Sequence, residues 1–372
     1  MNERDEHEHF VDAGLYDPDA PDAEARLAVL EFLTDEVGAS IPEIVQALEE
    51  NRVLSMAAFR TIRPDGGRAT LAQTAERAGI SPASAVRVWR AAGFPDPRPY
   101  ERRFGEADVQ LLELYRSTRH FVGEDAALQL VRTIGSAVSQ VAEAEIAMVR
   151  SNMEAPFTAR GEFVEVARRY RDIVADLFPR IVGALDTLHR HHVDAIARRY
   201  SGTSPSAANV VALAVGFADL SGYTGISSQL DPEELGEMLD RFEATTSDVV
   251  AAAGANVVKR IGDAVMFVTN APGVACTLGL DLVAATAMAR LPKLRVGLAF
   301  GDVVVRQGDF YGPTVNLAAR LVAATDPGTV LADGVLQRRL ARARGAYTFV
   351  PAGRLPLSGF NNPIEAYQLL RH

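Results

Sequence analysis

The sequence contains a single cysteine, Cys276, among its 372 residues. One cysteine excludes an intramolecular disulfide, and its position in an apolar helical pattern predicts a buried, unreactive thiol. No apolar run approaches the roughly 18 to 20 residues that a membrane-spanning helix needs. The first residues are acidic and polar, unlike a secretory signal. These absences predict a cytoplasmic protein without a membrane anchor.

Lysine is almost as scarce, with Lys259 and Lys293 set against 36 arginines. Where arginine is the habitual cation, a lysine close to a functional aspartate suggests a need for its compact ammonium group. The formal net charge is −10, and most of the acidic excess lies in the first 200 residues. An acidic total disfavours extended binding to nucleic acid or to anionic membranes.

The chain divides by its hydrophobic pattern. Residues 1–22 are rich in Asp and Pro and predict an acidic flexible tail. Apolar residues recur at three-to-four spacing over 23–200, which predicts an all-helical domain whose last helix, 177–199, is a linker. A Gly-, Ser- and Pro-containing run at 201–206 marks a boundary. Short apolar strands then alternate with helices over 205–372.

Two aspartates follow strand-like runs in this second part. Asp219 lies in the sequence FADLSGYT and Asp263 in KRIGD. A strand that ends in Asp beside Gly places a carboxylate at a sheet edge, where a ligand can approach the backbone. Two such carboxylates on neighbouring strands suit a pair of Mg²⁺ ions, which prefer hard oxygen ligands and substrate phosphate.

A third segment, GDFYGPTVNLAAR at 308–320, carries polar residues at helical spacing. Asn316 and Arg320 are four residues apart, so on a helix both side chains project from one face. An amide and a guanidinium on one face can orient a hydroxyl group and stabilise a phosphate charge.

The three segments, in this order and spacing, resemble the catalytic domain of class III adenylyl cyclases over 210–370. The resemblance implies an α+β fold, in which an all-α regulatory domain precedes a ferredoxin-like palm with an antiparallel sheet. It also implies conversion of ATP to 3′,5′-cyclic AMP and pyrophosphate. A diguanylate cyclase is disfavoured because its Gly-Gly-Asp/Glu-Glu-Phe signature is absent.

The resemblance also implies roles for individual residues. Asp219, Asp263 and the backbone carbonyl of Leu220 would hold two Mg²⁺ or Mn²⁺ ions per active site. Lys259 and Asp309 would recognise adenine, since lysine donates to a ring nitrogen and aspartate accepts from the exocyclic amine. Guanylyl cyclases carry Glu and Cys at these places, so ATP is the expected substrate.

By the same resemblance, Asn316 orients the ribose and Arg320 stabilises the charge on the α-phosphate. The family draws the metal ligands from one chain, and both the adenine-recognising pair and the Asn–Arg pair from the other, which implies a head-to-tail homodimer with composite sites. The chain departs from the family at Ser358, where a triphosphate-binding lysine is usual. Ser358 supplies no charge, and Arg354 is the substitute candidate if the strand register turns it to the same side.

Segment 69–103 is similar to the helix-turn-helix of MerR-like modules. DNA binding would need Ser84, Arg87 and Arg90 in a major groove. The favoured interpretation is a helical packing unit with Trp89 and Val86 in its core, because the acidic surroundings repel phosphate. The alternative function is therefore a DNA-binding regulator whose cyclase-like domain only senses nucleotide.

The length, the domain order and the linker helix resemble a mycobacterial-type soluble subgroup with an autoinhibitory, pH-responsive regulatory domain. Three histidines, His189, His191 and His192, fall on the linker helix. Histidine ordinarily titrates near pH 6.5, so such a cluster can bias two helix arrangements. The hypothesis is that acid protonation relieves inhibition, and the alternative is a solvated polar helix face.

Overall fold

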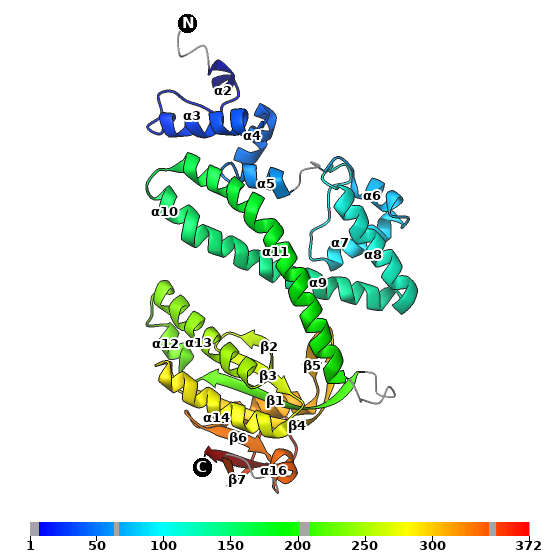
Figure 1. Ribbon diagram of the computed structural model, residues 1–372, viewed down its shortest axis with the longest axis vertical. Helices are drawn as coiled ribbons and strands as arrows, with labels where there is room; N and C mark the ends of the chain where they lie inside the picture. Colours follow the sequence, from blue (N-terminus) through cyan, green and yellow to red (C-terminus); the bar gives the residue numbers. More distant parts are fainter. Residues whose placement is uncertain (1–6, 63–66, 201–208, 342–346, 372) are drawn as a thin grey trace. The chain divides into compact units, whose positions relative to one another are not determined.

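The computed structural model describes residues 7–62, 67–200, 209–341 and 347–371 (Figure 1). Two compact units are present, Met1–Ala195 and Ile196–His372. The division falls inside one helix, α11 (Phe163–Tyr200), a few residues before the predicted breaker. That breaker, 201–206, lies outside the described residues. No described helix is long and apolar enough to cross a membrane.

The described part of the first unit is helical, as the periodicity predicts, with one isolated bridge between Ala69 and Phe104. Its helices are α2 (Glu8–Asp12), α3 (Ala23–Glu31), α4 (Ile41–Glu49), α5 (Met56–Ile62), α6 (Leu71–Arg77), α7 (Pro82–Ala91), α8 (Glu106–Val122), α9 (Glu124–Val149), α10 (Ala155–Thr158) and α11, with π-helical turns η1 (Phe32–Glu36) and η2 (Arg150–Glu154).

Local sequence explains where several of these helices begin. Ser40 and Glu43 form a capping box at the start of α4, and Thr70 and Gln73 form another at α6. Each box satisfies backbone N–H groups that have no partner inside the helix. Ser81 caps α7 by accepting a hydrogen bond from the Ser84 backbone N–H at 3.1 Å.

The segment predicted as a flexible tail is packed from residue 7 onward. Helix α2 forms within it, and Phe10 and Leu15 are only 2% and 3% exposed. The prediction rested on the acidic composition of the segment and gave no weight to its two large apolar side chains. Burial of these side chains offsets the conformational entropy lost when the segment is ordered.

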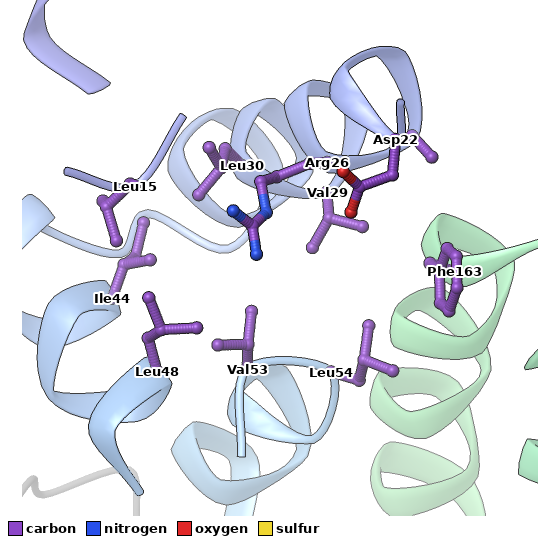
Figure 2. Close-up of a pocket in the computed structure, with 11 residues that line it drawn as sticks. Leu15, Asp22, Arg26, Val29, Leu30, Ile44, Leu48, Val53, Leu54 and Phe163 are labelled. Atoms are coloured by element: carbon purple, nitrogen blue, oxygen red, sulfur yellow. The ribbon is translucent and has the colours of Figure 1, made fainter. Parts of the chain in front are cut away.

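Helices α3 and α4 and the start of α11 surround a cavity of about 200 Å³ (Figure 2). Leu30, Ile44 and Val53 line it, and the Arg26 guanidinium points into it. The lining is mainly aliphatic, so this cavity suits apolar packing rather than acid–base chemistry.

The helix-turn-helix-like segment is a packing unit. Trp89 is 3% exposed, and its indole N–H donates to the Pro95 carbonyl at 3.0 Å. The fully buried valine of α7 is Val88, whereas Val86, expected in the core, is partly buried at its edge. A buried apolar face on α7 is what a helix docked in its own domain requires.

The arginines that a DNA-binding function would use have partners within the domain. Arg87 pairs with Glu124 at 2.5 Å, and Arg90 forms a two-pronged pair with Asp96. A guanidinium already paired with carboxylate has lost much of its value for a phosphate contact. The geometry therefore disfavours the DNA-binding alternative.

The second unit is built on an eight-stranded sheet in the order β2-β3-β1-β4-β6-β8-β7, with β5 paired to β4. All pairings are antiparallel except β4 with β6, which confirms the predicted α+β class. The strands are β1 (Val210–Leu220), β2 (Asn256–Ile261), β3 (Ala264–Thr269), β4 (Leu294–Arg306), β5 (Asp309–Tyr311), β6 (Val330–Asp333), β7 (Tyr347–Leu355) and β8 (Ile364–Arg371).

Helices cover both faces of this sheet: α12 (Tyr223–Ser227), α13 (Pro232–Ala252), α14 (Pro272–Met288), α15 (Pro313–Ala323) and α16 (Gly334–Leu340). Strand β1 is buried on both sides, because alternate residues point to opposite faces. Ala214 and Ala218 join the core under α13 and α14, while Val215 and Phe217 join the core under α15. Cys276 on α14 is fully buried, and burial raises the pKa of its thiol to about 12, which agrees with an inert thiol.

Asp333 is an ionisable group in this interior. It is 2% exposed, and it caps α16 by accepting a hydrogen bond from the Leu336 backbone N–H at 2.9 Å. Burial raises the pKa of its carboxyl group to about 6. Folding therefore favours the protonated form, and the resulting stability is present below the ordinary pKa near 4 and is lost as the pH rises through about 6.

We expect Asp333→Asn to remove this pH dependence, because asparagine keeps the accepting oxygen and cannot ionise. Between pH 4.5 and pH 7.5 the unfolding free energy of the unmodified chain should fall by on the order of 1 to 3 kcal/mol more than that of the variant. Denaturant unfolding of the second unit at the two pH values measures this. The exposed Asp326→Asn is the control. Equal pH dependence in all three proteins would contradict the assignment to Asp333.

Candidate active site

The two motif aspartates meet at one end of the sheet. Asp219 is the penultimate residue of β1 and is paired in register with Ala264 of β3, so Asp263 lies directly beside it in the β2–β3 turn. The turn passes through Gly262, whose φ of 60° suits glycine. The Leu220 backbone N–H donates to the Asp263 carbonyl at 3.2 Å, which ties the two segments together.

Electrostatics at this point favour a bound cation. Burial raises the pKa of the Asp263 carboxyl group, and the neighbouring Asp219 carboxylate raises it further. The Ser221 hydroxyl, next along the chain, is buried without a hydrogen-bond partner in the described part of the protein. A divalent ion would relieve the repulsion between the carboxylates, so these residues fit Mg²⁺ or Mn²⁺.

The donor set is incomplete for a structural metal centre. Over the described residues, no three His, Cys, Asp or Glu side chains gather in a possible metal-binding group. Two carboxylates leave most of an octahedral shell open to backbone oxygen, water and substrate phosphate. This is the pattern of an ion that is bound together with a phosphate-bearing ligand.

Arg295 is a member of the site that the sequence did not single out. It is the second residue of β4, lies opposite Asp219 in register, and forms an ion pair with the Asp219 carboxylate. Its Nε is buried without a hydrogen-bond partner among the described residues. The only sequence signal was an arginine at the start of an apolar strand, which is too common to be specific.

Lys259 and Asp309 come together although 50 residues separate them. Lys259 lies on β2 and Asp309 begins β5, and the Lys259 Nζ is 2.5 Å from an Asp309 carboxylate oxygen. The other oxygen of Asp309 accepts the Phe310 backbone N–H at 2.8 Å. A donor and an acceptor are thus held side by side and are partly exposed.

Asn316 and Arg320 project from α15 into solvent, as their spacing predicts. The opposite face of α15 packs on the sheet through Leu321 and Val322. This packing is close because β4 has Gly297 beneath the helix, where a Cβ atom would lie 2.2 Å from the Val322 backbone nitrogen. In the described part of the chain, neither polar side chain has a hydrogen-bond or ion-pair partner.

The remaining candidates are not brought to the carboxylates. Arg354 lies exposed on β7, in register with Glu365, and Ser358 lies in the turn that follows. In the strand order, β7 is at the opposite edge from β2 and β3. His189, His191 and His192 are exposed on α11, in the first unit.

Comparison with known proteins agrees with this arrangement. Residues 206–371 match the family model described as the adenylate and guanylate cyclase catalytic domain. The uncharacterized protein Rv2212 of Mycobacterium tuberculosis is 36% identical over 92% of this chain and 90% of its own length. An adenylate cyclase of Streptomyces coelicolor is 36% identical over 75% of this chain and 73% of its own length. The chain therefore belongs to the adenylate and guanylate cyclase family.

Two more distant matches complete the comparison. The pH-sensitive adenylate cyclase MT1302 of M. tuberculosis is 26% identical over 93% of this chain and 88% of its own length. Among solved structures, the adenylyl cyclase CyaB from P. aeruginosa is 22% identical, with a TM-score of 0.41, and covers 44% of this chain and 95% of its own.

Proposed function

We propose that this protein is an adenylate cyclase, which converts ATP to 3′,5′-cyclic AMP and pyrophosphate. The observation that carries the proposal is the Asp219–Asp263 carboxylate pair at one end of the sheet, in the same domain as the preassembled Lys259–Asp309 pair. The first pair suits a metal-bound triphosphate and the second suits adenine. The names of the S. coelicolor and other relatives support the choice of ATP.

Asp219 and Asp263, with the carbonyl of Leu220, would hold two Mg²⁺ or Mn²⁺ ions, which supply Lewis-acid activation of the ribose 3′-hydroxyl and neutralise the departing pyrophosphate. Arg295 forms an ion pair with the Asp219 carboxylate. With a cation held by Asp219, the Arg295 guanidinium would be available to bind phosphate oxygens, which are its preferred partners. Arg295 would then supply positive charge that Ser358 does not.

Recognition of the base follows from the chemistry of the Lys259–Asp309 pair. Lysine is a donor only and ionised aspartate is an acceptor only. Adenine offers an acceptor on its ring nitrogen and a donor on its amino group, and guanine reverses this order. A site with fixed donors and acceptors rejects the wrong base because its own polar groups are left unpaired.

Asn316 and Arg320, together with the Lys259–Asp309 pair, complete the site from a second copy of the chain. Asn316 orients the ribose, and Arg320 stabilises charge on the α-phosphate in the transition state. Both are exposed on α15 and have no side-chain partner among the described residues, which supports a role across an interface. A head-to-tail homodimer, with two composite sites, satisfies both requirements.

The direct test is cyclic AMP formation from Mn²⁺–ATP by the full-length chain, with Mn²⁺–GTP as the comparison. We expect cyclic AMP to form from ATP and only a minor amount of cyclic GMP to form from GTP. Binding of ATP without turnover, under conditions where the dimer is present, would overturn the proposal in favour of nucleotide sensing.

The first unit would act as an autoinhibitory regulatory domain that responds to pH through His189, His191 and His192. All three are exposed on α11, the helix that leads toward β1, and the named pH-sensitive relative covers both units. Protonation adds up to three positive charges to one stretch of this helix. Added charge disfavours docking against an apolar surface, so acid should raise activity.

Replacement of all three histidines by asparagine is therefore expected to flatten the activity–pH profile between pH 5.5 and pH 8. The measurement is the initial rate at saturating Mn²⁺–ATP across that range. His120→Asn, on α8, is the control and should leave the profile unchanged. A triple variant that keeps the full acid response would contradict the role of this cluster.

A further inference from the structure

Strand β2, which carries Lys259, pairs irregularly with β3. Val257 pairs with Phe267, and Lys259 pairs with Met266. Val258, which lies between the two pairs on β2, is therefore an extra residue in this strand. Such a β-bulge changes which side of the sheet the following side chains face. Because side chains alternate along a strand, a one-residue slip that removed the bulge would exchange the sides of Lys259 and the residue after it.

The residue after Lys259 is a second cation, Arg260, and the two face opposite sides of the sheet. Arg260 lies on the side of α13, where its guanidinium donates to the Ser247 hydroxyl at 2.7 Å and lies 3.5 Å from a Glu243 carboxylate oxygen. Lys259 lies on the side of α15 and pairs with Asp309. The register of β2 thus decides which of the two cations meets Asp309.

Burial does little to fix this register. Strand β2 is at one edge of the sheet, so it pairs on one side only. None of its 6 residues is fully buried, and Ile261 at its end is 53% exposed. Register is weakly specified where a strand buries little of its surface. The slip would lengthen the β2–β3 turn from two residues, Gly262 and Asp263, to three, and hairpins accept both lengths.

We propose that Arg260 is a positioning residue, which holds β2 in the bulged register through its contacts with α13 and thereby presents Lys259 to Asp309. In the slipped register Arg260 would take the place of Lys259. A guanidinium binds a carboxylate through two parallel hydrogen bonds, so it would compete with the amino group of adenine for the oxygens of Asp309. The inference rests on the proposed recognition of adenine and extends its determinants to α13.

Arg260→Glu tests this role, because it sets two carboxylates against each other on the α13 side. We expect the preference for ATP over GTP to fall by at least about tenfold. The measurement is the ratio of the dissociation constants of 3′-deoxy-ATP and 3′-deoxy-GTP, which lack the attacking hydroxyl and therefore bind without turnover. Arg241→Glu makes the same change at an exposed arginine of α13 and is the matched control. Its preference should stay within about twofold of the unmodified chain.

Two further variants separate positioning from a general loss of stability. The combination of Arg260→Glu with Glu243→Arg restores an ion pair of opposite polarity, so its preference should return to within about threefold of the unmodified chain. Ser247→Ala leaves β2 itself unchanged and should lower the preference only a few-fold, because the contact is partly exposed. A double variant as unselective as Arg260→Glu alone would overturn the role of the α13 contact.

Failure of this inference and failure of the proposed function give different results. A preference for ATP that survives Arg260→Glu in full would overturn the positioning role and leave adenine recognition intact. Equal binding of the two nucleotides by the unmodified chain would overturn adenine recognition by Lys259, and the positioning role with it. Cyclic AMP formation, measured separately, decides the catalytic proposal.

Discussion

Asp219→Asn is expected to lower kcat for cyclic AMP formation by at least about a thousandfold. Asparagine is nearly the same size as aspartate, so the end of β1 keeps its shape. It lacks the charge that would hold a divalent cation and balance the triphosphate, and one neutral oxygen is a poor ligand for Mg²⁺. Initial rates at saturating Mn²⁺–ATP measure the loss.

The matched control for this variant is Asp248→Asn, which removes an exposed carboxylate from α13 in the same unit. Its activity should stay within about twofold of the unmodified chain. The Asp219 variant also releases Arg295 from its ion pair, so its unfolding midpoint is measured alongside. A folded Asp219→Asn protein with near-normal turnover would exclude a metal-binding role for this residue.

Mixing two inactive variants is expected to restore activity. Asp219→Asn removes a proposed metal ligand and Arg320→Ala removes the guanidinium proposed to stabilise phosphate charge, so neither homodimer should have a complete site. If the site is composite, a heterodimer has one site with both defects and one site with neither. At equal concentrations half of the dimers are heterodimers, so about a quarter of the unmodified activity should return.

The control for the mixing experiment is a pair of variants with defects in the same half of the site. Asp219→Asn mixed with Asp263→Asn should stay inactive, because both changes affect the metal ligands of one chain. Recovery in this control would show that mixing itself alters the enzyme. No recovery with the Arg320 variant, under conditions where subunits exchange, would mean that each site is built within one chain.

The sequence was most informative where function depends on local geometry. Asp219 lies at the end of β1 and Asp263 lies in the turn after β2, each within three residues of a glycine. Both features depend only on neighbours in the sequence. Asn316 and Arg320 needed only helical periodicity to be placed on one face of α15. Such predictions succeed because the neighbours that determine them lie within a few residues.

The alignment of strands that are far apart in the sequence could not be predicted from local patterns. The Arg295–Asp219 ion pair depends on how β4 aligns with β1, and these partners are 76 residues apart. The pairing of β7 with β8 was not predicted, because Pro351 and Gly353 interrupt the apolar alternation of β7 where its register shifts. The burial of Phe10 depends on helices that follow it in the chain, which composition alone does not reveal.

The glycine beneath α15 constrains how this enzyme can change. With Gly297 in β4, the helix that carries Asn316 and Arg320 rests on main-chain atoms rather than on a deformable layer of side chains. Any larger residue at 297 would push α15, and with it both side chains, away from the sheet. The distance between α15 and the sheet is therefore set by the backbone contact at Gly297. Substitutions on α15 can change which side chains project from it, but not how far they lie from the sheet.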